Sequence, residues 1–396
     1  MDANAGDPTD RLFLDRSTDI VQTVEKLIAN NRVDALHTLA TALDAEVEDL
    51  RIRLNRAEFA LQHVIFTLAE TRGEAYVETL LRLLPNRPFL YHRLRALVSA
   101  MASHQDPDML LQIVARYLDS NEYRQSVGEY FHIELMSLLV HEMIVHGVNV
   151  LSTPSVMLLH NKMRGRRHPL AWLPMFLTDL EDRLLDYLPE ANQRAAFTLP
   201  PVPPSMVAPL EEVPSVVQPM LPLGLPPVDA PLPAIKETTR TYTSERMRVA
   251  VAHWYNMEAR SFAFDAPLPA HAVTPRLLLA LGLECLEGVT EDSIRVVPVR
   301  PNIVLARLFT IAATGGPHEG YERAYGRLHA WQSLAALAGA APDEQIGPVT
   351  ERVKAGRWFH FEAPADWFHQ AGWDIGIAVL RPDGLSLAIL AATATD

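Results

Sequence analysis

The stretch from residue 199 to residue 233 divides this chain. Twelve prolines fall within it, including the pairs Pro200-Pro201, Pro203-Pro204 and Pro226-Pro227. Proline has no amide proton and a fixed φ, so neither a helix nor the interior of a sheet can continue here, and extended polyproline II backbone is expected. We therefore predict a helical domain over residues 1–198, a proline-rich linker over 199–240 and a smaller mixed α/β domain over 241–396.

The linker is also rich in valine, leucine and methionine. A free tether is usually more polar than this. We therefore predict that much of the linker lies against a domain surface. At 396 residues, the chain is long enough to build two substantial hydrophobic cores on either side of it.

Apolar residues between positions 36 and 68 follow an unbroken 4-3 spacing. The positions are Leu36, Ala40, Leu43, Val47, Leu50, Leu54, Ala57, Leu61, Val64 and Leu68. This spacing puts their side chains on one stripe of a helix and predicts either one long helix or two helices that meet near Asn55. The stripe either packs inside its own domain, which we favour because apolar helices follow at once, or forms a dimeric coiled coil.

Further amphipathic segments follow at short intervals and predict that the N-terminal domain is entirely helical. They cover about residues 74–84, 89–102, 108–118, 125–145, 155–163 and 170–188. Short connections force neighbouring helices to run antiparallel, as they do in bundles and α-solenoids. We expect a helical bundle or a solenoid-like array.

The C-terminal part mixes helical and strand-like patterns, so the predicted fold class is α+β. Helices are expected over 245–257, 276–286 and 320–338, strands over 260–264 and 294–299, and either form over 302–313. Two alternating apolar runs flank Arg381-Pro382-Asp383-Gly384 and predict a final β-hairpin in which Val379 faces Leu387. Both faces of this hairpin carry apolar or small residues, which is typical of strands inside a sheet.

Net charge and cysteine content narrow the classes of function. The formal charge of −13 argues against a general nucleic-acid binder, whose domain would be basic. The single cysteine, Cys285, cannot form an internal disulfide, and its leucine neighbours indicate a buried apolar residue. The polar, acidic start does not resemble a signal peptide, and no uncharged apolar run approaches the ~18 residues of a membrane helix. We expect a cytoplasmic protein that does not bind membranes.

Aromatic and acidic residues crowd the stretch from residue 358 to residue 374. Within it, Glu362, Asp366, His369 and Asp374 are the candidates for an acid/base site. A carboxylate beside large apolar groups can have a raised pKa, which suits general acid catalysis. The alternative is that the aromatic residues close a small sheet and that Asp366 caps a turn.

A compact basic cluster, Lys162, Arg164, Arg166 and Arg167, lies between two helical segments. Such a cluster could bind phosphate, nucleic acid or an acidic partner. The alternative is a solvated connection between helices.

Two further motifs carry little chemistry. His141 and His146 are five residues apart, so their rings point in different directions from a helix, whereas a zinc-protease motif needs a spacing of four. The glycine-rich residues 314–321 precede a helix but lack the Lys-Ser/Thr of a phosphate-binding loop. We therefore expect neither a metal nor a cofactor.

Three segments near the C-terminus resemble a known family. They are Ala324-Tyr-Gly-Arg-Leu-His-Ala-Trp-Gln-Ser-Leu334, Trp373-Asp-Ile-Gly-Ile-Ala-Val-Leu-Arg-Pro-Asp-Gly384 and the tail Leu390-Ala-Ala-Thr-Ala-Thr-Asp396. They resemble an actinobacterial family known only as a domain of unknown function, mainly over the last third of the chain. The resemblance implies a bacterial protein and brings no catalytic residues.

The sequence therefore favours a binding or scaffold protein over an enzyme. Extended helices and a proline-rich linker are typical of a chain that associates with a protein partner or with itself, and no complete catalytic constellation is visible. Two alternatives remain open. One is a hydrolase with its site among the C-terminal acids and histidines, and the other is an immunity protein of a bacterial conflict system.

Overall fold

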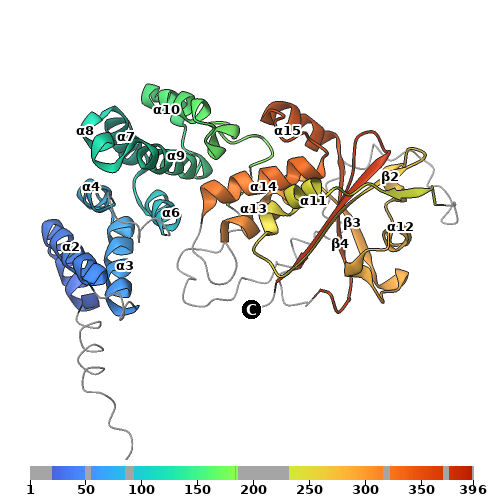
Figure 1. The fold of residues 1–396 in the computed structure, drawn as a ribbon, viewed down its shortest axis with the longest axis horizontal. Coiled ribbons are helices and arrows are strands. Elements are labelled where there is room, and N and C mark those ends of the chain that lie inside the picture. The colour runs from blue at the N-terminus through green and yellow to red at the C-terminus, as the bar shows by residue number, and fades with distance from the viewer. Residues whose placement is uncertain are drawn as a thin grey trace, which may run out of the picture. The chain divides into compact units, whose positions relative to one another are not determined.

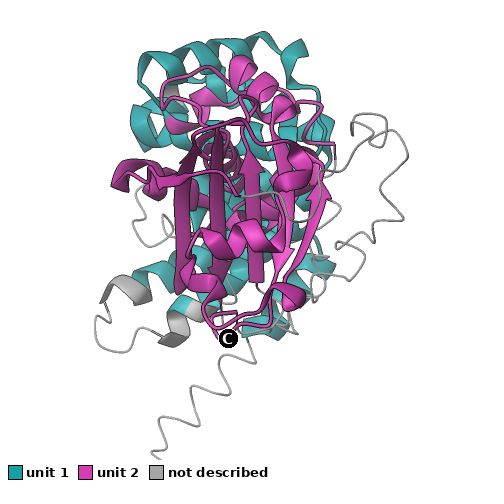
Figure 2. Cartoon of the chain, turned by 90° about the vertical axis from the view of Figure 1, so that its right-hand side faces the viewer, with its two compact units in different colours: residues 1–168 teal, residues 169–396 magenta. Residues whose placement is uncertain are grey.

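The computed structural model describes residues 20–49, 55–84, 93–182, 184–185, 232–314, 322–368 and 374–394. The chain forms two compact units, which we call the helical unit (Met1–His168) and the sheet unit (Pro169–Asp396) (Figure 2). The boundary between the two units lies between residues 168 and 169, whereas the sequence predicted that the helical domain ends at residue 198. Most of the predicted linker lies outside the described residues, and its last part contains a β-strand.

The helices of the helical unit follow one another closely along the chain. After a helix over residues 20–29 come α2 (Val33–Asp49), α3 (Asn55–Glu70), α4 (Glu74–Leu83), α6 (Leu94–His104), α7 (Pro107–Asp119), α8 (Asn121–Val127), α9 (Glu129–Val145), the 3-10 helix η1 (Val150–Ser152) and α10 (Pro154–Gly165). In one row α3 contacts α6 and α6 contacts α9, while in a second row α4 contacts α7 and α7 contacts α10 (Figure 1). This alternation between two layers matches the solenoid-like prediction.

Helix boundaries in this unit follow ordinary capping chemistry. Asp106 caps α7, because its carboxylate accepts a hydrogen bond from the Met109 amide at 2.9 Å, and Pro107 occupies the first turn. The predicted helix over 125–145 is instead two helices. Gly128, with a φ of 79°, separates α8 from α9.

The 4-3 stripe is shared between two helices that pack against each other, α2 and α3. Those of its residues whose burial is described are all buried, namely Leu36, Ala40, Leu43, Leu61, Val64 and Leu68. In addition, α2 contacts α4, and α3 contacts both α4 and α6. These contacts support packing of the stripe inside its own unit rather than dimerisation through it.

The sheet unit is built on an antiparallel sheet. Its strands are β1 (Ile235–Glu237), β2 (Asn256–Phe264), β3 (Arg295–Val299), β4 (Arg357–Glu362), β5 (Asp374–Leu380) and β6 (Ser386–Thr393), in the spatial order β1-β2-β6-β5-β4-β3. The final hairpin, β5 and β6, therefore occupies the middle of the sheet, as predicted. Both edge strands are short, and β3 contains Pro298, which has no amide proton to offer a further strand.

Helices cover both faces of this sheet (Figure 1). On one face α12 (Pro275–Ala280) packs on a core that includes Leu277, Phe361 and Ile389. On the other face α11 (Thr241–Arg248) contacts β2 and α14 (Arg323–Leu337) contacts β6, while α13 (Pro301–Thr314) and α15 (Ile346–Ala355) pack against α14. The α+β class predicted from the sequence is thereby confirmed.

The predicted register of the final hairpin is wrong by one residue. Val379 pairs with Ala388, and Leu380 pairs with Leu387. The connection is one residue longer than expected, because the Arg381 amide donates to the Ser386 carbonyl at 2.8 Å and closes a loop over residues 382–385. Both faces of the hairpin still carry apolar residues, so the strands tolerate either register on hydrophobic grounds.

Three predicted helices end early or do not form. The helix expected over 276–286 stops at Ala280, and residues 284–286 form a separate 3-10 helix. The helix expected over 245–257 stops at Arg248, and Asn256 already belongs to β2. Among the described residues of the helix expected over 170–188, the 3-10 helix η2 (Pro169–Trp172) is the part that forms, because Pro174 cannot continue a helix. The ambiguous residues 302–313 lie within α13.

Candidate functional site

The acidic residues proposed from the sequence stand on different parts of the sheet unit. Glu362 ends β4, and Asp374 begins β5. In the register of these two strands, side chains alternate between faces so that Glu362 and Asp374 extend from opposite faces of the sheet. Asp366 lies exposed in the turn after β4, and His369 lies outside the described residues. Glu362 and Asp374 therefore do not form the paired carboxylates of an acid/base site.

Asp374 has structural contacts of its own. Its carboxylate accepts a hydrogen bond from the Thr393 hydroxyl at 2.6 Å, which joins the start of β5 to the end of β6. Its backbone carbonyl accepts a bond from Arg307 of α13 at 3.4 Å. These contacts hold the end of the central hairpin together.

Glu362 lies beside a buried histidine. Its carboxylate oxygen is 3.6 Å from Nδ1 of His360, and the Glu362 side chain is about half exposed. Burial holds the pKa of His360 well below its ordinary value, and the nearby cations Arg307 and Arg295 lower that pKa further. The imidazole is therefore neutral at neutral pH and does not form a charged pair with Glu362.

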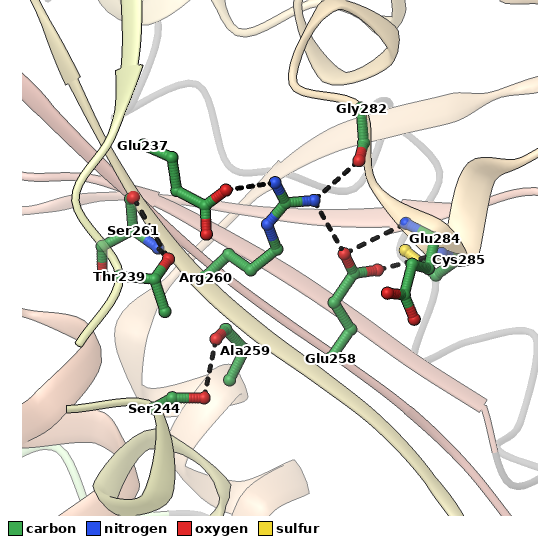
Figure 3. A network of polar contacts seen from close by, with 10 residues as sticks. All are labelled: Glu237, Thr239, Ser244, Glu258, Ala259, Arg260, Ser261, Gly282, Glu284 and Cys285. Carbon is green, nitrogen blue, oxygen red and sulfur yellow. Dashed lines mark hydrogen bonds and ion pairs between the residues drawn. The ribbon is translucent and has the colours of Figure 1, made fainter. Parts of the chain in front are cut away.

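A polar network that the sequence did not indicate joins β2 to the 3-10 helix η7 (Glu284–Leu286) (Figure 3). The buried carboxylate of Glu258 accepts the Glu284 amide at 3.0 Å and the Cys285 amide at 2.9 Å. Arg260 lies 3.3 Å from the same carboxylate. Two backbone donors and a guanidinium thus satisfy this carboxylate, which is how a buried charge is ordinarily accommodated.

The Arg260 side chain extends the same network to the edge of the sheet (Figure 3). It donates to the Gly282 carbonyl at 2.6 Å and forms an ion pair with Glu237 of β1. Its guanidinium also lies 5.2 Å from the centre of the Phe262 ring. Arg260 therefore binds both the edge strand β1 and the connection that precedes η7.

Cys285 is buried within this network and is not suited to nucleophilic chemistry. Burial raises the pKa of its thiol far above the ordinary value, and the adjacent Glu258 carboxylate raises it further. A thiol that stays protonated is a poor nucleophile. The prediction that Cys285 is a buried apolar residue is confirmed.

A second buried network connects residues 169–185 to α14. The carboxylate of Glu181 accepts hydrogen bonds from Arg327 Nε at 2.5 Å and from Trp331 Nε1 at 2.9 Å. Arg327 also donates to the Phe176 carbonyl at 2.7 Å. The Glu181 and Arg327 side chains are both 0% exposed. This network explains why residues 169–185 belong to the sheet unit, although the sequence assigned them to the helical domain.

The basic cluster predicted from the sequence lies at the end of α10 and in the turn that follows. Lys162, Arg164, Arg166 and Arg167 are all exposed. Arg166 pairs with Glu129, at the start of α9, at a distance of 2.6 Å, with both side chains half exposed. Within the described part of the chain, Arg166 is the one member of this cluster that forms an ion pair.

Arg167 adopts an unusual backbone conformation. Its φ is 56°, in the left-handed region, where most helices place a glycine. Its amide donates to the Arg164 carbonyl at 3.1 Å, and the His168 amide donates to the Met163 carbonyl at 2.9 Å, as at a normal helix end. A left-handed conformation costs a residue with a side chain about 1–2 kcal/mol. Arg167 therefore occupies a position where glycine would be more stable.

Apolar side chains next to this cluster are also exposed. Leu151 in η1 is 45% exposed, and Met157 and Leu158 in α10 are 40% and 61% exposed. The inward face of α10 is formed instead by the buried residues Val156, Leu159 and Met163. We call Leu151, Met157 and Leu158 the apolar patch, and the patch together with the basic cluster the α10 surface. The exposure of Met157 and Leu158 is predictable from helical periodicity, because both residues lie off the stripe that the buried residues define.

The two weaker motifs are described only in part. His141 and His146 lie within and just after α9. The described residues contain no group of three or more His, Cys, Asp or Glu side chains that could hold a metal ion. Of the glycine-rich residues 314–321, all but Thr314 lie outside the described part of the chain.

A stacked helical unit followed by an antiparallel sheet with helices on both faces defines an α+β protein. Residues 18–396 match DUF6183, a family of unknown function, and the chain belongs to this family. The match covers nearly the whole chain, so the family likeness is not restricted to the last third. No curated protein and no solved structure matches the chain. Among the described residues, no helix has the length and apolar character needed to cross a bilayer.

Proposed function

We propose that this protein is a binding protein whose helical unit docks a partner protein through the α10 surface. The observation that carries this proposal is the exposed apolar patch, in which Leu158 is 61% exposed beside Met157. Single exposed leucines are ordinary, but neighbouring large apolar side chains on one helix favour an interaction site. Layered helical arrays present such surfaces on a rigid scaffold.

The geometry of the sheet unit supports binding over hydrolysis. Glu362 and Asp374 extend from opposite faces of the sheet. Glu258 and Glu181, which are buried, have their oxygens engaged by backbone and side-chain donors. A general acid or base needs a carboxylate that can approach a substrate.

The experiment is a comparison of partners captured in the native cell by full-length protein and by two variants. Leu158→Asp places a charge in the apolar patch, while Leu385→Asp makes the same change at an exposed leucine of the sheet unit. After chemical crosslinking and quantitative mass spectrometry, we expect one or more partners to be retained by the wild type and by Leu385→Asp and lost with Leu158→Asp. Identical partners for all three proteins would contradict the proposal.

A further inference from the structure

The α10 surface carries both apolar and positively charged side chains along one helix. Met157 and Leu158 lie in its first half, and Lys162 and Arg164 lie in its last turn. Residues 158 and 162 are one helical turn apart and share a face. Since α10 has 12 residues and rises about 1.5 Å per residue, the helix is about 18 Å long. An occupant of this length meets apolar side chains at one end and cations at the other.

The sequence of α10 and of the residues on either side of it carries no negative charge. The chain carries a net charge of −13, yet no Asp or Glu occurs between Glu142 and Asp179. Three carboxylates from other elements contact α10 or the turn after it. Asp119 of α7 accepts the Ser155 hydroxyl at 3.1 Å, and two acids of α9 lie beside the turn, where Glu129 pairs with Arg166 and Glu134 lies 2.7 Å from His168. At physiological salt the Debye length is about 8 Å, so a ligand close to the surface experiences this local charge more strongly than the net charge of the chain.

We infer that the occupant of the α10 surface is an acidic segment of a partner protein, in which aspartate or glutamate residues accompany large apolar side chains. This inference rests on the proposed function and specifies the chemistry of the partner. Carboxylates would pair with the basic cluster, and apolar side chains would cover Met157 and Leu158. A nucleic acid fits less well, because its phosphate and sugar backbone would leave the apolar patch exposed to water.

The backbone at Arg167 supports a role in binding rather than in stability. Glycine would relieve the left-handed conformation at this position, where φ is 56°. Strain of this kind is commonly kept at functional sites. Arg167→Gly therefore separates the two roles, because the variant should keep or raise the unfolding temperature while it weakens the binding of acidic peptides.

The test begins with a displayed library of random peptides, each long enough to span the α10 surface, selected on the full-length protein. The most enriched peptide is then synthesised, labelled and titrated by fluorescence anisotropy at low and high salt. We expect enriched sequences that combine acidic and apolar residues. Leu158→Asp should weaken binding at least about tenfold, because it removes apolar contact and adds a repelling charge. Arg164→Ala with Arg167→Gly should weaken it about tenfold and flatten the salt dependence.

Matched variants control for charge and for folding. Lys236→Ala removes an exposed cation from β1, and Leu385→Asp adds a charge in the sheet unit. Both should bind like the wild type, and circular dichroism should show all variants folded. Light scattering adds a check on self-association, because a dimer that Leu158→Asp dissociates would make a second copy of the chain the occupant and overturn the inference.

Other results also decide the question. Enriched peptides with no excess of acidic residues, or affinity that neither α10 variant changes, would overturn the inference. Preferential binding of a single-stranded DNA or RNA probe that competes with the peptide would overturn it too. If Leu158→Asp still releases a crosslinked partner while the selected peptides are neutral or basic, the proposed function stands and only the acidic chemistry fails.

Discussion

The buried pair of Glu181 and Arg327 provides the sharpest test of how the sheet unit is held together. Both side chains are 0% exposed. The perturbation is Glu181→Gln, which keeps the size of the side chain and removes its charge. The glutamine can still accept a bond from Trp331, but the Arg327 guanidinium then remains buried with the carbonyls of Pro174 and Phe176 as its neutral acceptors.

The magnitude follows from the cost of an uncompensated buried charge. Removing one partner of a buried ion pair destabilises a protein by about 3–5 kcal/mol, because the remaining charge keeps its desolvation penalty and loses its counter-charge. Arg327→Met should cost a similar amount. Replacing both, with Glu181→Leu and Arg327→Met, removes both penalties and should cost far less than the two single changes together.

The assay must distinguish the two units, because a chain with two compact units need not unfold in one step. Urea-dependent hydrogen exchange, read by mass spectrometry on peptides from α14, reports the stability of the sheet unit directly. We expect lower protection in both single variants and substantial recovery in the double variant. Losses below about 1 kcal/mol in both single variants would refute the reasoning, because they would fit a solvated ion pair rather than a buried one.

Three further changes test other parts of the fold. Gly326→Ala should lower the free energy of unfolding, measured in urea, by about 1–3 kcal/mol, because a Cβ there would lie 2.7 Å from the α13 backbone. The control is Gly347→Ala, which should be neutral or stabilising because no atom lies within 4 Å of the added Cβ. Glu258→Gln should speed the reaction of Cys285 with a thiol reagent under native conditions, because the backbone bonds that hold η7 weaken. The pKa of His360 is lower in the folded than in the unfolded chain, so below about pH 6.5 the unfolded chain takes up a proton that the folded chain does not. The stability present above that pH is therefore lost as pH falls towards the folded pKa. The His360→Leu variant should lose less stability than the wild type between pH 7 and pH 5.

Local signals predicted much of the fold because their chemistry is completed within a few residues. The Asp106-Pro107 pair starts α7 by capping and by a fixed φ, and the alternating residues on either side of Gly384 place two strands in the sheet. The exact register of that hairpin escaped prediction, since it depends on whether Leu385 belongs to the loop or to the strand. Because both faces carry apolar residues, the hydrophobic pattern does not distinguish between two registers that differ by one residue.

Contacts between residues far apart in the sequence could not be predicted from local sequence patterns. Glu181 and Arg327 are 146 residues apart, and nothing near Glu181 indicates that its partner lies on α14. The same limit applies to the acidic candidates, because the faces from which Glu362 and Asp374 extend are set by strand register. The basic cluster, in contrast, was visible because its members are neighbours in sequence. The exposure of Met157 and Leu158 can be predicted in the same way, because both lie off the stripe that the buried residues of α10 define.

The buried carboxylates of the sheet unit and the exposed cations of α10 differ in what their charges can do. In the sheet unit, Glu258 and Glu181 are buried and engaged by several donors, which stabilises the fold and leaves these carboxylates little capacity to bind a ligand. On α10, cations are exposed beside apolar side chains, and one of them, Arg167, adopts a backbone conformation that favours glycine. Exposed apolar area and a strained residue both reduce solubility or stability. An interaction that uses the α10 surface would account for both costs at once, whereas a merely solvated turn accounts for neither.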